Sequence, residues 1–141
     1  MDKISRLQRS RNMSRIKSKN TRPELLVRQA LHSIGIRYRI HNKDLPGKPD
    51  ISIKKYKLAV EIRGCFWHRH ENCRLSSYPK TNKSYWINKI EGNQKRDLKN
   101  KIKLEKSGYK VFVIWECQTK SITLLNEKIE ILKNYILTKK Q

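Results

Sequence analysis

The sequence predicts a single α/β domain in which a mixed β-sheet carries helices on its faces. The chain has 141 residues, enough for one hydrophobic core. Its apolar residues recur at helical spacing in some segments, and in others they alternate or form continuous runs. Taken in order, these segments give a helix, three strands, a second helix, a fourth strand and a last helix.

The first helix is expected to run from Thr21 to Ile34. Thr21-Arg22-Pro23-Glu24 fits a capping box with a proline at an early helical position, and Gly35 fits a helix end. A first strand is expected over residues 36–41, because Ile36, Tyr38 and Ile40 alternate with polar residues.

The next two strands are expected to form a hairpin. The prolines and glycine of LPGKP (45–49) cannot extend a helix or a central strand, so a strand begins at Asp50. A turn at residues 54–56 returns the chain to LAVEIR (58–63), where a period of two places Glu61 and Arg63 on one face. The hairpin brings the carboxylates of Asp50 and Glu61 together.

A long helix is expected from residue 81 or 82 to about Lys106, before Ser107-Gly108. The run YKVFVIWEC (109–117) predicts a strand covered on both faces and closed by Cys117, and a last helix follows over residues 122–137. The long helix has an intermittent apolar face, formed by Trp86, Ile90, Leu98 and Ile102.

Three antiparallel strands followed by a helical crossover to a parallel fourth strand give a mixed sheet. This order of elements is that of the restriction-endonuclease-like core. We expect residues 1–20 to form a basic arm and residues 21–141 to form the single domain.

The charge of the chain indicates a polyanionic partner. Lys and Arg number 34 against 12 Asp and Glu, which gives a net charge of +22. Nucleic acid is therefore the expected partner. A membrane is disfavoured because no run reaches the roughly 18 apolar residues of a spanning helix, and without an export signal the protein is expected in the cytoplasm. We expect the arm to follow DNA phosphates through bases that include Arg11, Arg15, Lys17 and Lys19.

Asp50 and Glu61 fit a Mg²⁺ site, because hydrolysis of a phosphodiester needs a hard cation bound by carboxylate oxygens. The backbone carbonyl of Ile62 supplies a third oxygen. Arg63 stays protonated, so its expected task is to hold a phosphate oxygen or to stabilise developing negative charge. The alternative is a simple ion pair of Glu61 with Arg63 on the sheet surface.

The cysteines indicate a second metal site. Three cysteines without an export signal favour metal binding over a disulfide framework. Cys65, Cys73 and Cys117 with one histidine would make a Cys₃His zinc site, in which the spacing C-x₄-H-x₂-C selects His70, and the other histidine is left free for acid, base or phosphate contacts. Free thiols are the alternative.

Phe66 and Trp67 directly follow Cys65 in the loop that this zinc site would hold. They are either core aromatics or a wedge that inserts between base pairs, at a cost of a few kcal/mol per unstacked step. That cost falls where the duplex already carries a mismatch. Trp86 either joins them or packs in the core.

Several motifs together resemble the very-short-patch-repair (Vsr) DNA mismatch endonuclease family. The resemblance extends from about Ser10 to Cys117. It rests on these motifs: RNMSRIKSKNTRPE (11–24), LPGKPD (45–50), GCFWH (64–68), His70, Cys73, PKTN (79–82), Trp86, KIEGN (89–93), RD (96–97) and VIWEC (113–117).

The resemblance implies a monomeric, Mg²⁺-dependent enzyme with a restriction-endonuclease-like fold and a structural zinc ion. Such an enzyme nicks one strand of double-stranded DNA beside a T:G mismatch and starts very short patch repair. Asp50 would be the essential metal ligand, with His68 as the active-site histidine and Glu24 as its partner. The resemblance also implies two further sets: zinc ligands Cys65, His70, Cys73 and Cys117, and intercalating aromatics Phe66, Trp67 and Trp86.

The sequence departs from the family pattern before GCFWH. It has Ile62-Arg63 where family members carry a Thr-His pair, and it has Glu61 where they are usually non-acidic. A second active-site histidine is therefore missing at that position. Two alternatives stay open: a restriction or defence nuclease that acts on matched or modified duplex, and a catalytically inactive, zinc-containing DNA-binding module.

Overall fold

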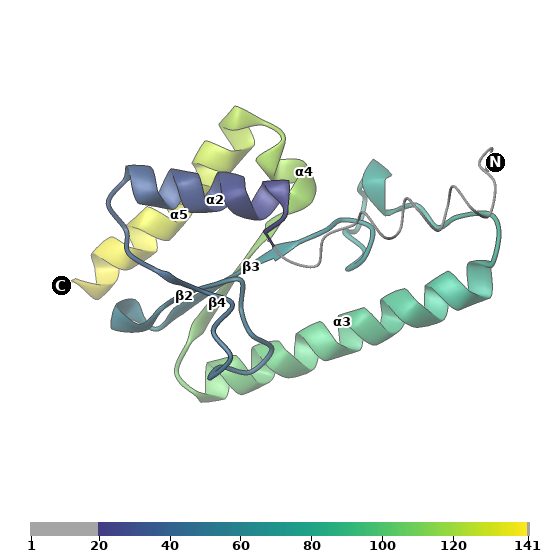
Figure 1. The fold of residues 1–141 in the computed structure, drawn as a ribbon, viewed down its shortest axis with the longest axis horizontal. Coiled ribbons are helices and arrows are strands. Elements are labelled where there is room, and N and C mark those ends of the chain that lie inside the picture. Colours follow the sequence, from purple (N-terminus) through teal and green to yellow (C-terminus); the bar gives the residue numbers. More distant parts are fainter. Residues whose placement is uncertain (1–19, 141) are drawn as a thin grey trace.

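The computed structural model describes residues 20–140. Arg11, Arg15, Lys17 and Lys19 of the expected arm lie outside the described residues. Figure 1 shows the elements, which are, in order, α2 (Arg22–Ser33), β1 (Arg39–Ile40), β2 (Ile51–Ile53), β3 (Leu58–Arg63), α3 (Lys83–Lys106), β4 (Lys110–Trp115), α4 (Glu116–Thr119) and α5 (Ile122–Lys139). Short 3₁₀ turns span Lys54–Tyr56 and Arg74–Ser76.

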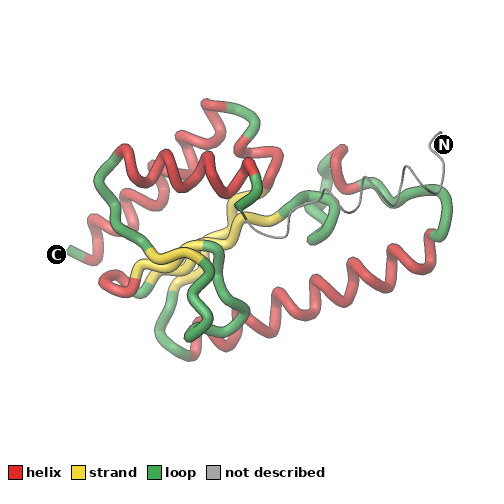
Figure 2. The backbone as a smooth tube through the Cα atoms, in the orientation of Figure 1, coloured by secondary structure: helices red, strands yellow, loops and turns green. Residues whose placement is uncertain are grey.

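The four strands form one sheet in the order β1-β2-β3-β4. β2 is antiparallel to β1 and to β3, whereas β4 runs parallel to β3, with Glu61 opposite Val113. Figure 2 shows the strands between helices on either side. This arrangement confirms the predicted mixed sheet and the restriction-endonuclease-like fold.

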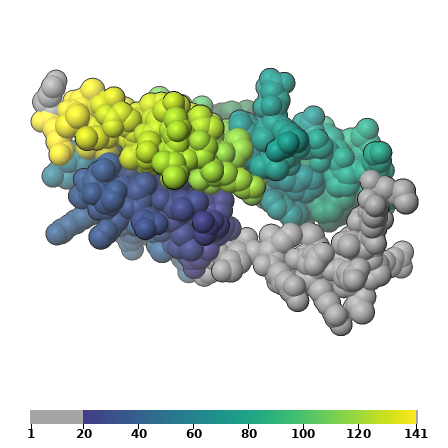
Figure 3. Space-filling model, turned by 90° about the horizontal axis from the view of Figure 1, so that it is seen from above, coloured from purple at the N-terminus to yellow at the C-terminus, as the bar shows by residue number. Residues whose placement is uncertain are grey.

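The alternation along β3 separates two hydrophobic layers. Leu58, Val60 and Ile62 belong to the larger core, which includes buried residues of α2 and α5. Ala59, on the opposite face, packs with Leu104 of α3. By the same period of two, Glu61 and Arg63 lie on the face that α3 covers. Figure 3 shows α5, in yellow and green, lying along the purple and blue segment that contains α2.

Three details of the predicted elements are wrong. The first strand is limited to Arg39–Ile40, because the N–H of Ile36 still donates to Leu31 of the preceding helix. β4 ends at Trp115, and Cys117 lies in the short helix α4 instead of closing the strand. The expected apolar face of α3 fails over its second half, where Leu98 and Ile102 are exposed.

The other predicted boundaries agree with the structure to within a few residues. α2 begins after the cap Thr21, α3 begins after Asn82, and α5 buries Leu125, Ile129, Leu132 and Ile136 as its spacing requires. No helix among residues 20–140 has both the length and the apolar character needed to span a membrane.

Candidate active site and metal centre

An open pocket of about 810 Å³ lies where the start of α2, the end of β3 and the middle of α3 meet. Its charged and polar lining brings together residues far apart in the sequence, namely Thr21, Arg22, Glu24, Lys48, Asp50, Glu61, Arg63, His68, Asp97, Asn100 and Glu116. Phe66 and Trp67 form part of its wall. All five residues expected to be catalytic line this pocket.

Asp50 stands directly before β2, as expected. Its Oδ2 accepts a hydrogen bond from the backbone N–H of Ile62 on β3, at 2.7 Å. Burial, with a smaller contribution from the negative charges of Glu24 and Glu61, raises the pKa of Asp50 to about 6, against the lowering effect of that hydrogen bond. The backbone of Ile62 thus fixes one oxygen of Asp50.

Glu61 and Arg63 point to one face, as the alternation of β3 requires. Arg63 Nη2 donates to Glu61 Oε2 at 2.6 Å, and both side chains are largely buried. Glu61 and Arg63 both line the pocket, so their ion pair belongs to this site and is not a simple pair on the outer sheet surface. Arg63 Nε is also 3.9 Å from Asp97 Oδ2 of α3.

His68 pairs with Asp97. Nδ1 of His68 lies 2.6 Å from Asp97 Oδ2, which joins the loop after β3 to α3. The expectation that Glu24 is the partner of His68 is therefore wrong. The carboxylate of Asp97 leaves Nε2 of His68 as the nitrogen that can exchange a proton elsewhere.

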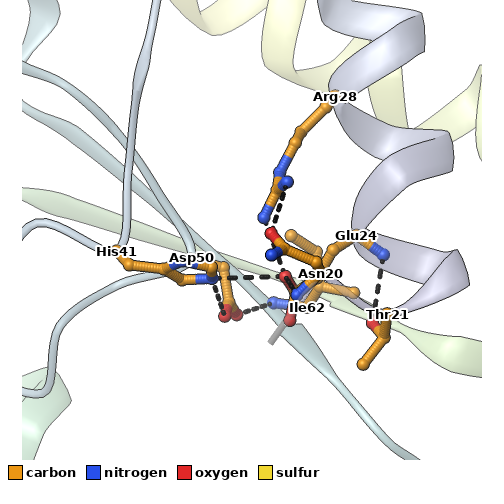
Figure 4. A network of polar contacts seen from close by, with 7 residues as sticks. All are labelled: Asn20, Thr21, Glu24, Arg28, His41, Asp50 and Ile62. Carbon is orange, nitrogen blue, oxygen red and sulfur yellow. Dashed lines mark hydrogen bonds and ion pairs between the residues drawn. The ribbon is translucent and has the colours of Figure 1, made fainter. Parts of the chain in front are cut away.

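Glu24 is 4% exposed and contacts a different histidine, His41. Its Oε2 accepts from the backbone N–H of Asn20 and from Arg28 Nη2, each at 2.9 Å, and lies 3.2 Å from His41 Nε2 (Figure 4). The N–H of Glu24 donates to Thr21 Oγ1 at 3.4 Å. Glu24 therefore has both the expected position at the helix cap and a place at the active site.

Sequence reasoning missed His41 and the role of Asp97. His41 Nε2 is 4.0 Å from Asp50 Oδ1, and Glu24, His41 and Asp50 can each offer one ligand atom within 4.8 Å of the others. The only sequence signal was the place of His41 just before the loop that leads to Asp50. For Asp97, the signal was the RD pair at 96–97.

The four expected zinc ligands come together beyond the end of β3. Three of them lie in the loop that follows this strand, and Cys117 lies in α4. Cys65, His70, Cys73 and Cys117 each offer a ligand atom within 4.8 Å of the others. His70 Nδ1 lies 3.7 Å from Cys65 Sγ and 3.4 Å from Cys117 Sγ. Ligands about 2.1–2.3 Å from a tetrahedral ion are separated by roughly this distance. The group is thus compatible with a zinc ion.

The protonation of these ligands follows from their surroundings. Burial raises the pKa of Cys65 to about 12 and also raises that of Cys117. Burial lowers the pKa of His70, and Lys128 adds to this effect, which favours the neutral imidazole that a metal needs. A bound ion would have to displace protons from the thiols. The ring of His70 also stacks on Trp115, with centroids 4.3 Å apart.

The three aromatics implied by the resemblance form one cluster. The ring centroids of Phe66, Trp67 and Trp86 are 5.2, 5.4 and 5.7 Å apart in pairs. Asn93 of α3 donates from Nδ2 to the backbone oxygen of Trp67 at 2.9 Å. The aromatic loop is therefore anchored to α3 as well as to the cysteine cluster.

The family model of the DNA mismatch endonuclease Vsr matches residues 1–74. A Type II nicking enzyme of Xanthomonas oryzae pv. oryzae is 43% identical over 128 residues, or 91% of this chain and 93% of that protein. A Type II nicking enzyme of Neisseria meningitidis serogroup A is 47% identical, over 88% of each chain. The DNA mismatch endonuclease Vsr of Escherichia coli is 35% identical, over 77% of this chain and 69% of that protein. The protein therefore belongs to the DNA mismatch endonuclease Vsr family, and it is a DNA endonuclease.

Proposed function

We propose that this endonuclease nicks one strand of double-stranded DNA beside a T:G mismatch, using Mg²⁺, and so starts very short patch repair. The observation that carries the proposal is the place of Asp50. Its carboxylate pairs with no Lys or Arg among residues 20–140, and its ligand atom lies within 4.8 Å of those of Glu24 and His41. Names of relatives as nicking enzymes and as a mismatch endonuclease support the same reading.

Asp50 is the principal ligand of the catalytic Mg²⁺ in this proposal. Its Oδ1 is not used by the hydrogen bond from Ile62. The Ile62 carbonyl and Glu61 are the further oxygen donors, although Glu61 must share its carboxylate with Arg63. When bound, the ion supplies an activated water and neutralises charge at the scissile phosphate.

The other pocket residues act on the phosphate and on protons. Arg63, held by Glu61, binds a phosphate oxygen and stabilises the charge that develops as water adds to phosphorus. His68, oriented by Asp97, exchanges a proton through Nε2 as one P–O bond forms and another breaks. Glu24 contributes by keeping the start of α2 against Asp50.

The cysteine cluster and the aromatic cluster position the DNA for cleavage. We assign a structural Zn²⁺ to Cys65, His70, Cys73 and Cys117, which fixes the loop that carries Phe66 and Trp67. With Trp86, these aromatics form the wedge that enters the duplex at the weakened mismatch. The arm of residues 1–20, with Arg11, Arg15, Lys17 and Lys19, adds phosphate contacts to a monomer whose domain spans residues 21–141. Its place of action is the cytoplasm.

The test is a nicking assay with Mg²⁺ on duplexes that are identical except for one base pair. We expect cleavage of one strand beside T:G at a rate at least tenfold above that of the matched duplex. Trp67→Ala is expected to reduce this ratio. Equal cleavage of matched and mismatched duplexes would reject the repair function and favour a restriction or defence nuclease. No cleavage with Mg²⁺ or Mn²⁺ would indicate an inactive DNA-binding module.

A further inference from the structure

We propose that His41 is a direct nitrogen ligand of the divalent ion at Asp50, together with Glu24. The resulting nitrogen and oxygen donor set would bind transition-metal dications more tightly than Mg²⁺. This inference rests on the proposed metal site at Asp50, and it adds a residue that neither the motifs nor the family resemblance indicated.

The separations between the three side chains suit a shared ion. His41 Nε2 lies 3.2 Å from Glu24 Oε2 and 4.0 Å from Asp50 Oδ1. Two ligand atoms about 2.1 Å from one ion, at right angles to each other, are roughly 3 Å apart. At 4.0 Å, Asp50 and His41 are too far apart for a hydrogen bond, and a small movement would place both on an ion.

The three ligands are held by the backbone around them (Figure 4). The N–H of His41 donates to the carbonyl oxygen of Asp50 at 3.2 Å, so the two residues are tied together directly. Oδ2 of Asp50 is bound to the Ile62 N–H, which leaves Oδ1 on the side of His41. Glu24 is fixed by its buried position in the first turn of α2.

The charges at this point also favour a cation. Glu24 and Asp50 are close enough for each negative charge to oppose the other, and Arg28 neutralises only Glu24. A divalent ion would compensate the remaining charge. It would use His41 as a neutral ligand, with the proton on Nδ1 and the lone pair on Nε2.

The imidazole changes which metal the site prefers. Mg²⁺ binds oxygen donors and keeps several waters, so it gains little from a nitrogen ligand. Transition-metal dications accept imidazole readily. Removal of His41 should therefore weaken Mn²⁺ binding far more than Mg²⁺ binding.

The test uses the zinc-loaded full chain without DNA and measures Mn²⁺ binding by electron paramagnetic resonance. His41→Asn is the main variant, because residue 41 has a left-handed backbone (φ 45°) that asparagine tolerates, and its shorter side chain does not reach the ion. His41→Gln is the second variant, and His32→Asn, at an exposed position of α2, is the matched control. Circular dichroism verifies that each variant is folded.

We expect coupling of bound Mn²⁺ to an imidazole ¹⁴N in the unmodified protein and in His32→Asn. Both His41 variants should lose this coupling and bind Mn²⁺ at least tenfold more weakly, while Mg²⁺ affinity, measured by competition, changes less than threefold. A coupling that survives in the His41 variants but disappears in His68→Asn would overturn the inference. So would unchanged Mn²⁺ affinity in the His41 variants when Asp50→Asn abolishes binding, and that result would leave the proposed function standing.

Discussion

The proposed role of Asp50 as a metal ligand requires an ionised carboxylate, but the surroundings of this residue favour the protonated form. Its burial next to Glu24 and Glu61 raises its pKa to about 6, whereas metal binding requires the ionised form. In the proposed metal site a bound cation would offset this effect, and without a cation the ionised carboxylate destabilises the folded state.

That cost predicts how stability depends on pH in the absence of divalent ions. The unfolded carboxyl has a pKa of 3.8 and the folded one about 6, so the folded state holds its proton longer. Stability contributed by this group falls as pH rises from about 4 to 6 and stays low above that. Asp50→Asn should therefore be more stable than the unmodified protein by about 1–3 kcal/mol at pH 8, and by much less at pH 4.5.

Urea unfolding at the two pH values measures this difference. Asp44→Asn, at an exposed carboxylate, is the control and should show no such pH-dependent gain. The account of the Asp50 environment fails if Asp50→Asn gives the same gain at both pH values.

The pair of His68 and Asp97 predicts a purely catalytic defect. Asp97→Asn removes the carboxylate that orients the imidazole, so the single-turnover nicking rate should fall by roughly 10²–10⁴-fold. DNA affinity, measured by fluorescence anisotropy, should change little. A variant that keeps its rate would show that His68 does not need this partner.

The positions of site residues could be predicted from the sequence where a local pattern, such as alternation or spacing, determines them. The period of two along residues 58–63 placed Glu61 and Arg63 correctly, and the spacing of cysteines found the Cys₃His group. His41 and Asp97 were missed as functional partners because they reach the site through tertiary contacts, from the residue after β1 and from α3, that no local pattern encodes.

At the scale of elements, helix ends and strand pairing were predictable because caps, glycines and alternation determine them. The first strand was overestimated, since Ile36 and Tyr38 pack against the core without pairing in the sheet. Leu98 and Ile102 follow helical spacing, yet both are exposed, whereas Leu104 of the same helix is buried. Spacing predicts which residues share a face, and it does not predict what covers that face.

The loop of residues 64–82 contains no helix or strand except one short 3₁₀ turn, so backbone hydrogen bonds of regular structure do little to hold it in place. We expect it to depend on the cysteine cluster. Cys73→Ser should reduce the zinc content measured by atomic absorption and lower the midpoint of thermal unfolding by at least about 5 °C. Ser77→Ala, in the same loop, is the control. Zinc content of one ion per chain in Cys73→Ser would exclude that cysteine as a ligand.

At the scale of the whole molecule, the net charge of +22 governs affinity more than it governs the fold. Composition alone could therefore predict a polyanionic partner and could not distinguish an enzyme from a binding module. The pocket geometry and the comparisons supply that distinction.

The charge predicts a steep dependence of DNA affinity on salt. Replacing Arg11, Arg15, Lys17 and Lys19 together by glutamine should flatten the slope of log K against log salt by up to about 3.6, at ~0.9 per lost phosphate contact. Affinity should fall for matched and mismatched duplexes alike, as measured by anisotropy between 50 and 300 mM salt. An unchanged slope would show that these bases do not contact phosphates.

We propose that one carboxylate, Asp50, organises hydrolysis, while DNA binding depends on other residues. The most direct test compares Asp50→Ala with the unmodified protein for nicking of a T:G duplex under single-turnover conditions and for DNA affinity. We expect the nicking rate of Asp50→Ala to fall by at least about 10³-fold, which corresponds to roughly 4 kcal/mol of the barrier, with DNA affinity kept within threefold. Full nicking activity in Asp50→Ala would contradict it.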